Sequence, residues 1–125
     1  MEDRFWLSGT AETPEVVFDR AKNEFKISGK SMPEDAYEFY APIHTWLEDY
    51  RERPNGRTKF DFSLDYFNSS SVKQVFKILC ILEEITESGK DVDVSWHYRK
   101  GDELMLMKGL EFDKFLDLTI DVRER

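Results

Sequence analysis

A run of three serines follows an asparagine where a strand-like segment gives way to a helical one. The sequence Asn68-Ser69-Ser70-Ser71 comes after Thr58–Tyr66, in which polar and apolar residues alternate as in a half-buried strand. It leads into a segment from about Ser71 to Glu87 that is apolar around much of a helical circumference. We therefore expect Ser69, Ser70 or Ser71 to be the N-cap of a buried helix or to lie beside it.

The residues alone leave two interpretations of this serine run open. In the first, a serine oxygen only accepts a hydrogen bond from one of the backbone N–H groups that lack a partner inside the helix. In the second, a phosphate on that hydroxyl faces the same N–H groups and the positive end of the helix dipole. The phosphate adds about −1.5 to −2 charges at pH 7. A partner that buried this charge unpaired would lose on the order of 3 kcal/mol, or about a hundredfold in affinity.

Other side chains that could act in catalysis or metal binding have simpler explanations. Glu34 and Asp35 follow Pro33 at the expected start of a helix, where the dipole favours acids. His44 and His97 fall on different expected elements, and no Cys/His spacing fits a zinc site, so we expect exposed polar histidines and no metal or cofactor. We expect the sole cysteine, Cys80, to be a packed thiol. No phosphate-binding glycine loop, nucleophile elbow or zinc-protease motif occurs.

Composition narrows the class of protein. The chain has 125 residues, which suits one domain spanning residues 1–125, and 40 % apolar residues are enough for a core. Its 26 acidic and 18 basic residues give a net charge of −8, which disfavours nucleic acid and acidic membrane surfaces as direct partners. The beginning of the chain does not resemble a signal peptide, and no apolar run could span a bilayer. We expect a cytoplasmic location.

The sequence also predicts the strands and helices that position the serine run. The prediction rests on hydrophobic periodicity and on the turn residues that separate the periodic segments. Short apolar or alternating segments predict strands, and 3.6-residue periodicity predicts helices. We expect strands at Arg4–Leu7, Glu15–Asp19, Glu24–Ser28, Thr58–Tyr66, a segment from Val92 to Tyr98, and Phe115–Val122. We expect helices from Ser31–Glu34 to about Arg53, kinked or broken near Pro42, from Ser71 to Glu87, and from Asp102 to about Asp113. This order predicts an α/β or α+β sandwich with an N-terminal hairpin and helices packed against a mixed sheet.

Several short motifs together resemble one protein family. They are Gly9-Thr10 followed by Thr13-Pro14, the stretch from Ile27 to Glu34, Phe39-Tyr40 and Trp46-Leu47, the stretch from Tyr66 to Lys73, Leu82-Glu83-Glu84, and the stretch from Val94 to Tyr98. Spread along nearly the whole chain, this combination is similar to the SiaC family of regulatory phosphoproteins. These are STAS-like proteins that regulate by partner switching, as anti-sigma-factor antagonists do.

The resemblance implies a partner-switching circuit. A dedicated protein kinase would phosphorylate the residue after the asparagine, here Ser69, and a PP2C-like phosphatase would reverse the reaction. The family position most associated with phosphorylation is a threonine, and serine retains the hydroxyl. The unmodified form would bind and activate a diguanylate cyclase, which raises cyclic di-GMP and favours biofilm. Ser70 and Ser71 remain alternative acceptors.

The resemblance also implies a binding surface around the acceptor. Asn68 would shape the turn, Ser70 and Ser71 would cap the helix, and Lys73 would help to neutralise the phosphate. Glu34 and Tyr37 would form part of the rim that the partner contacts. Two other classes of function remain as alternatives: a small hydrolase that uses acidic residues, which would need carboxylates converging in a pocket, and a passive assembly protein in which the serines are only caps.

Overall fold

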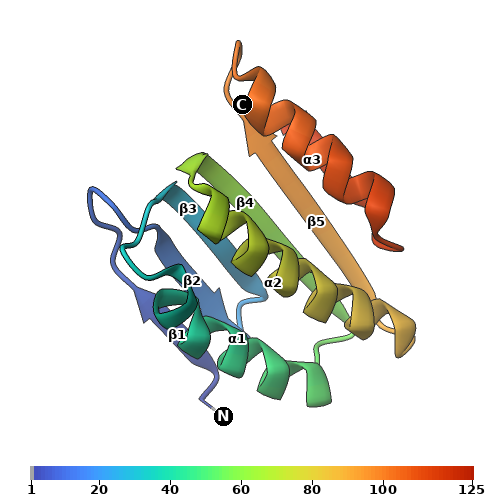
Figure 1. Cartoon of the computed structure of the whole chain (residues 1–125). Coiled ribbons are helices and arrows are strands. Elements are labelled where there is room, and N and C mark those ends of the chain that lie inside the picture. Colours follow the sequence, from blue (N-terminus) through green and yellow to red (C-terminus); the bar gives the residue numbers. More distant parts are fainter. Residues whose placement is uncertain (1) are drawn as a thin grey trace.

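The computed structural model describes residues 2–125, which form six strands and three helices (Figure 1). The strands are β1 (Arg4–Leu7), β2 (Glu15–Asp19), β3 (Glu24–Ser31), β4 (Arg57–Phe67), β5 (Asp91–Tyr98) and β6 (Ile120–Glu124). The helices are α1 (Ala36–Glu52), α2 (Ser69–Glu87) and α3 (Glu103–Phe115). The predicted order of elements is therefore confirmed. No helix among the described residues has the length and apolarity needed to cross a bilayer.

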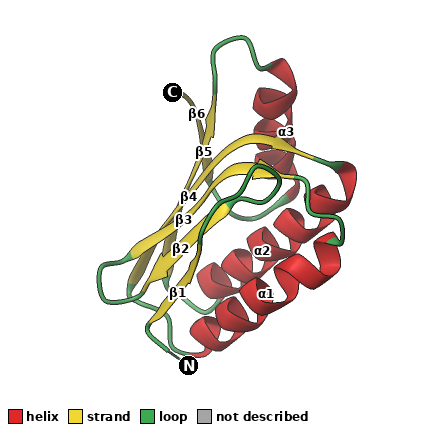
Figure 2. Cartoon of the chain, turned by 90° about the vertical axis from the view of Figure 1, so that its left-hand side faces the viewer, coloured by secondary structure: helices red, strands yellow, loops and turns green. Residues whose placement is uncertain are grey.

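The six strands form one mixed sheet in the order β1-β2-β3-β4-β5-β6. The first two pairings are antiparallel, which confirms the N-terminal hairpin, and the pairings from β3 to β6 are parallel. Each parallel connection contains one helix and moves to the next strand in the same direction. Crossovers of one hand then place their helices on the same side, and Figure 2 shows all three helices on one side of the sheet.

The core lies between the sheet and the helices. On β4 the side chains of Thr58, Phe60, Phe62 and Leu64 are buried, while the residues between them are exposed or half-buried. Period-two alternation explains this difference, because successive side chains of a strand point to opposite faces. The outer face of the sheet is polar and carries ion pairs such as those of Arg57 with Asp91 and Asp93.

Helix α1 is continuous through Pro42, so of the two predicted alternatives, a kink or a break, the break is wrong. Pro42 is exposed, as is Glu38, whose carbonyl loses the bond that Pro42 cannot donate. Water can satisfy that carbonyl on the solvent side of the helix. The predicted start of α1 is also early, because β3 continues to Ser31 and the N-cap is Asp35, whose side chain accepts from the N–H of Glu38.

The start of β6 and the pairing of β4 also differ from prediction. Strand β6 begins at Ile120, whereas Phe115 is the last residue of α3. On β4, the pairing with β3 skips Asp65, so that Tyr66 is 49 % exposed rather than buried with Phe60 and Phe62. Phe67 instead packs on the core, with its ring centroid 5.9 Å from that of Trp96.

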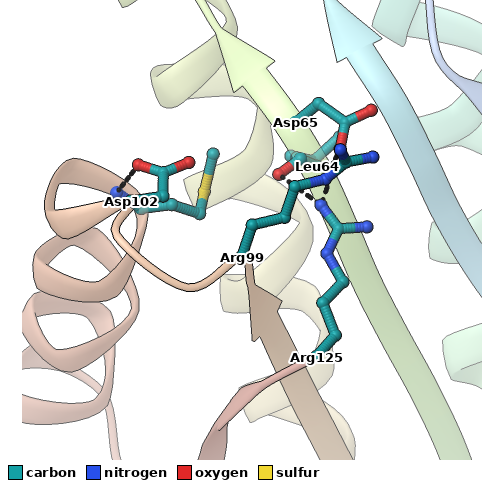
Figure 3. A network of polar contacts seen from close by, with 6 residues as sticks. Leu64, Asp65, Arg99, Asp102 and Arg125 are labelled. Carbon is teal, nitrogen blue, oxygen red and sulfur yellow. Dashed lines mark hydrogen bonds and ion pairs between the residues drawn. The ribbon is translucent and has the colours of Figure 1, made fainter.

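The skipped residue Asp65 anchors the ends of β5 and β6 (Figure 3). Its Oδ1 accepts from Arg99 Nε at 3.0 Å and from Arg125 at 2.7 Å. The N–H of Arg125 donates to the carbonyl of Tyr98 at 2.9 Å. The same picture includes Asp102, whose side chain caps α3 by accepting from the N–H of Met105 at 3.1 Å.

Candidate functional site

The turn between β4 and α2 is organised by Asn68. Asn68 is the N-cap of α2, and its Oδ1 accepts from the N–H of Ser71 at 3.0 Å and from the hydroxyl of Ser70 at 3.2 Å. The expectation that Ser70 and Ser71 cap the helix is therefore wrong. The asparagine oxygen satisfies a free N–H of the first turn, which is the role expected of a serine, and Ser69 becomes the first residue of the helix.

The three serines differ sharply in accessibility. Ser69 and Ser70 are exposed, whereas Ser71 has no exposed surface. The hydroxyl of Ser71 donates to the carbonyl of Ser31 at 3.1 Å and accepts from the hydroxyl of Ser31 at 2.9 Å. The first two serines are accessible from solvent, while the third belongs to the interior.

Ser31, Tyr40 and Ser71 form a buried polar cluster that joins the end of β3 to α1 and α2. The Tyr40 hydroxyl lies 2.7 Å from Ser31 Oγ. Because the single hydroxyl hydrogen of Ser31 is directed at Ser71, Tyr40 must be the donor in this pair. Burial raises the pKa of Tyr40 to about 12, and its hydrogen bond with Ser31 offsets only part of that rise. Tyr40 therefore keeps its proton at neutral pH.

The same strand end also receives the serine turn. The N–H of Asn68 donates to the carbonyl of Ser31 at 3.0 Å, so Ser31 contacts the turn through its backbone, and its hydroxyl contacts Ser71 of α2. The N-terminal turns of α1 and α2 are thus tied to one residue at the carboxyl end of β3. Sequence reasoning missed this cluster, because the predicted strand ended at Ser28 and Ser31 was placed at the start of a helix. One signal was present: a tyrosine on the core stripe of α1, whose buried hydroxyl needs a partner.

A groove of about 840 Å³ lies between these two helix starts. Residues 34–39 line it from α1 and the loop before it, and Ser70, Lys73 and Gln74 line it from α2. The structure thus places four of the predicted site residues, Glu34, Tyr37, Ser70 and Lys73, on one concavity. Ser69 and Asn68 are not part of the lining and lie next to it along the chain.

The lining combines an aromatic side chain with an acidic rim. Tyr37 is 73 % exposed. Glu34, Asp35 and Glu38 contribute carboxylates, and Lys73 is the single basic residue of the lining. Such a surface suits a protein partner, because it offers one large amphipathic anchor surrounded by charge.

The other candidate residues have structural roles. His44 is buried, contrary to prediction, and its Nε2 lies 3.0 Å from the carbonyl of Gln74, which joins α1 to α2. His97 Nε2 lies 3.3 Å from Asp61 Oδ1 on the outer face of the sheet. Cys80 is half-buried against the core, and burial is the main cause that raises the pKa of its thiol. Among residues 2–125, no three His, Cys, Asp or Glu side chains converge as metal ligands would.

The structure thus places two exposed serine hydroxyls at or beside an acidic groove at one edge of an α/β sandwich. The sequence profile of the SiaC family of regulatory phosphoproteins matches residues 7–125. The chain belongs to the SiaC family and is a regulatory protein, not an enzyme. The family resemblance and fold class predicted from the sequence are confirmed.

Individual relatives agree with this assignment. An uncharacterized protein of Pseudomonas aeruginosa (strain UCBPP-PA14) is 31 % identical over 106 residues, which cover 85 % of this chain and 84 % of the relative. SiaC of P. aeruginosa has a similar structure, with a TM-score of 0.89 and 26 % identity over 99 % of this chain and 100 % of the other. A second structure contains the diguanylate cyclase SiaD of P. aeruginosa in complex with its activator SiaC, and matches with a TM-score of 0.88 and 27 % identity over 97 % and 99 % of the two chains.

Proposed function

We propose that this protein activates a diguanylate cyclase while Ser69 is unmodified, and that phosphorylation of Ser69 prevents this. A protein kinase adds the phosphate, and a PP2C-like phosphatase removes it, in the cytoplasm. The observation that carries the proposal is the position of an exposed Ser69 in the first turn of α2, one residue from the groove that holds Tyr37 and Ser70. This protein is similar to SiaC, which activates the diguanylate cyclase SiaD, and this similarity suggests a diguanylate cyclase as the target.

Accessibility and existing hydrogen bonds favour Ser69 over its neighbours. Ser71 is fully buried and bonded to Ser31, so its modification would require opening the core. Ser70 is exposed, but its hydroxyl already donates to Asn68 and lines the groove. Ser69 is exposed, and its hydroxyl takes no part in the hydrogen bonds that the Asn68 side chain makes with Ser70 and Ser71. It follows the capping Asn68 directly.

The fold can tolerate a phosphate that a bound partner cannot. At Ser69 the phosphate lies beside the free N–H groups of the first turn of α2, where a negative charge stabilises the helix by about 0.3–1 kcal/mol when exposed. A partner lying across the groove would have to desolvate the same phosphate. The rim already carries three carboxylates and one lysine, so it offers little positive charge to compensate. We expect modification to lower affinity while the protein stays folded.

The test compares Ser69→Ala, Ser69→Glu and the wild-type protein, with Ser70→Ala as the matched control. Binding to the cognate diguanylate cyclase and formation of cyclic di-GMP are measured with purified proteins. Wild type and Ser69→Ala should both activate the cyclase, whereas Ser69→Glu and the kinase-treated wild type should bind at least tenfold more weakly. Treatment with kinase should leave Ser69→Ala active.

Two results would contradict the proposal. One is equal activation by the phosphorylated and unphosphorylated protein. The other is a phosphopeptide map, made from protein of the native cell, that finds phosphate in this turn on a residue other than Ser69. Circular dichroism of each variant confirms that a loss of binding does not come from unfolding.

A further inference from the structure

Helix α3 is apolar on two opposite sides. Its inner side packs on the sheet through Met105, Gly109 and Phe112, all of which are buried. Its outer side carries four large apolar side chains that remain exposed: Leu104 at 83 %, Met107 at 63 %, Leu110 at 52 % and Phe115 at 71 %. A surface helix normally has one apolar stripe toward the core and polar residues on the opposite side. An exposed patch of this kind marks an interaction surface.

The outer side of α3 also has a shape that fits another helix. A shallow hollow of about 460 Å³ is lined by Met107, Leu110, Glu111, Lys114 and Phe115. The first four residues have the spacing i, i+3, i+4 and i+7. Four residues with this spacing form the hole that receives one side chain of a neighbouring helix in knobs-into-holes packing. The hollow therefore suits a single apolar side chain from a helix that lies along α3.

The charges in and beside this patch are self-complementary. Glu103 lies in the first turn of α3 and Lys114 in its last turn. Lys108 and Glu111 lie between them and form an ion pair at 3.4 Å. With the exposed Asp113, α3 carries three acids and two bases, so it holds only one negative charge of the net −8 of the chain. Two copies can thus approach here with little of the repulsion that their acidic excess would otherwise cause.

We propose that a second copy of this chain covers α3, with the two α3 helices antiparallel about a two-fold axis. In this arrangement Met107 of each copy fills the hollow of the other, and each Glu103 faces the Lys114 of its partner. The opposed helix dipoles also favour the antiparallel direction. A two-fold interface of this type uses the same patch on both copies, which is what the self-complementary charges allow.

The expected dimer is weak. Stable interfaces bury about 800 Å² on each partner, and four exposed side chains supply only part of that area. We therefore expect dissociation in the range of tens of micromolar, on the order of 10–100 μM. This inference is independent of Ser69 and of the groove, which involve α1 and α2.

Sedimentation equilibrium of the full chain between about 5 and 500 μM tests the proposal. Wild type should pass from monomer to dimer within this range, and Met107→Glu should remain a monomer. Glu103→Lys and Lys114→Glu should each weaken dimerisation by about three- to tenfold, because each homodimer then holds two like-charged pairs. Thermal unfolding followed by circular dichroism verifies that every variant is folded.

An equimolar mixture of Glu103→Lys and Lys114→Glu gives the sharpest result. In the mixed dimer, both 103–114 contacts again join a lysine to a glutamate, so association should return to about the wild-type level. This rescue requires the antiparallel two-fold arrangement. The proposal is overturned if wild type is monomeric throughout, which would leave the patch to a different protein. It is equally overturned by a dimer that ignores Met107→Glu or by a mixture that shows no rescue.

Discussion

Neighbouring serines with the same hydroxyl have different roles here because of where the backbone places them. Ser69 is exposed at the start of α2, Ser70 donates to the capping Asn68, and Ser71 turns inward to Ser31. Successive residues of a helix point about 100° apart, so one step along the chain changes the environment completely. At the scale of the residue, the role of each serine is therefore decided by the direction in which its side chain points and not by its residue type.

Ser71→Ala should destabilise the protein, whereas Ser69→Ala should not. Without the Ser71 hydroxyl, the buried Ser31 Oγ–H loses its acceptor, and a buried polar group left without a partner costs about 1–3 kcal/mol. The exposed Ser69 is expected to change the free energy of unfolding by less than about 0.5 kcal/mol. Urea denaturation of both variants measures the difference. Equal effects would show that the Ser31–Tyr40–Ser71 cluster contributes nothing to stability.

Acidification should destabilise the protein in part through His44. Burial is the largest cause that lowers its pKa, nearby Lys77 acts in the same direction, and the bond to Gln74 and the charge of Glu48 oppose them. Since the pKa is lower in the folded chain than the value of about 6.5 expected when unfolded, the unfolded state binds more protons below that value. The stability due to neutral His44 is present above pH 6.5 and is lost as the pH falls.

The matched comparison is His44→Gln, which cannot titrate in this range. Urea denaturation at pH 7.5 and pH 5 should show a larger loss of stability in wild type than in the variant. Other groups titrate in both proteins, so the difference between the two losses isolates His44. A variant that loses as much stability as wild type would exclude this residue as a cause.

At the scale of the element, α3 depends on close contact with β5. A Cβ built at Gly109 would overlap the ring of Trp96, whose Nε1 donates to the carbonyl of Met105 at 2.9 Å. Alanine normally favours a helix over glycine by up to about 1 kcal/mol. Here we expect Gly109→Ala to destabilise by about 1–3 kcal/mol, because α3 must move away from the indole.

Gly56→Ala is the matched control for that prediction. No atom lies within 4 Å of a Cβ at Gly56, so its substitution should change stability by less than about 0.5 kcal/mol. Thermal unfolding of the two variants separates the effect of packing from the general effect of replacing a glycine. A Gly109→Ala variant as stable as wild type would mean that α3 can shift without cost.

The elements that could be predicted from the sequence are those that one local pattern determines. Strand β2 has the predicted bounds because a run of β-branched and aromatic residues lies between two acidic residues, and α3 is capped by Asp102 at its predicted start. The exposure of Tyr66 could not be predicted, because the skipped Asp65 depends on the pairing with β3. The cap of α2 is Asn68 because the helix begins at Ser69, three residues before Val72, the first apolar residue of its pattern.

The residues of the candidate site could be predicted from the sequence, but the groove that they form could not. The serine run and the loop from Glu34 to Tyr37 were both identified, yet their meeting on one groove depends on two facts of tertiary structure. Strands β3 and β4 are parallel neighbours, so α1 and α2 both begin at the same edge of the sheet. Ser31 then fixes both helix starts through its backbone and its hydroxyl. Neither contact has a signature in local sequence.

At the scale of the whole molecule, the topology separates stability from binding. The core lies between the sheet and the inner sides of the helices, while the groove is formed by the N-terminal parts of α1 and α2 and the loop before α1. Ligands commonly bind at this carboxyl edge of α/β sheets, because side chains there are positioned by the core without belonging to it. Substitutions at the groove should therefore alter partner binding with little effect on folding.

Tyr37→Ala tests this separation most directly. Tyr37 is 73 % exposed, so its removal should change the free energy of unfolding by less than about 0.5 kcal/mol. As the large aromatic anchor of the groove, it should weaken binding to the cyclase by about 2 kcal/mol, or roughly thirtyfold. Trp6→Ala is the matched control, since Trp6 is an aromatic residue, 57 % exposed, on the edge strand β1. Isothermal titration calorimetry against the cyclase should find wild-type affinity for Trp6→Ala. If both variants bind equally well, the partner does not use the groove, and the surface that it contacts must lie elsewhere on the molecule.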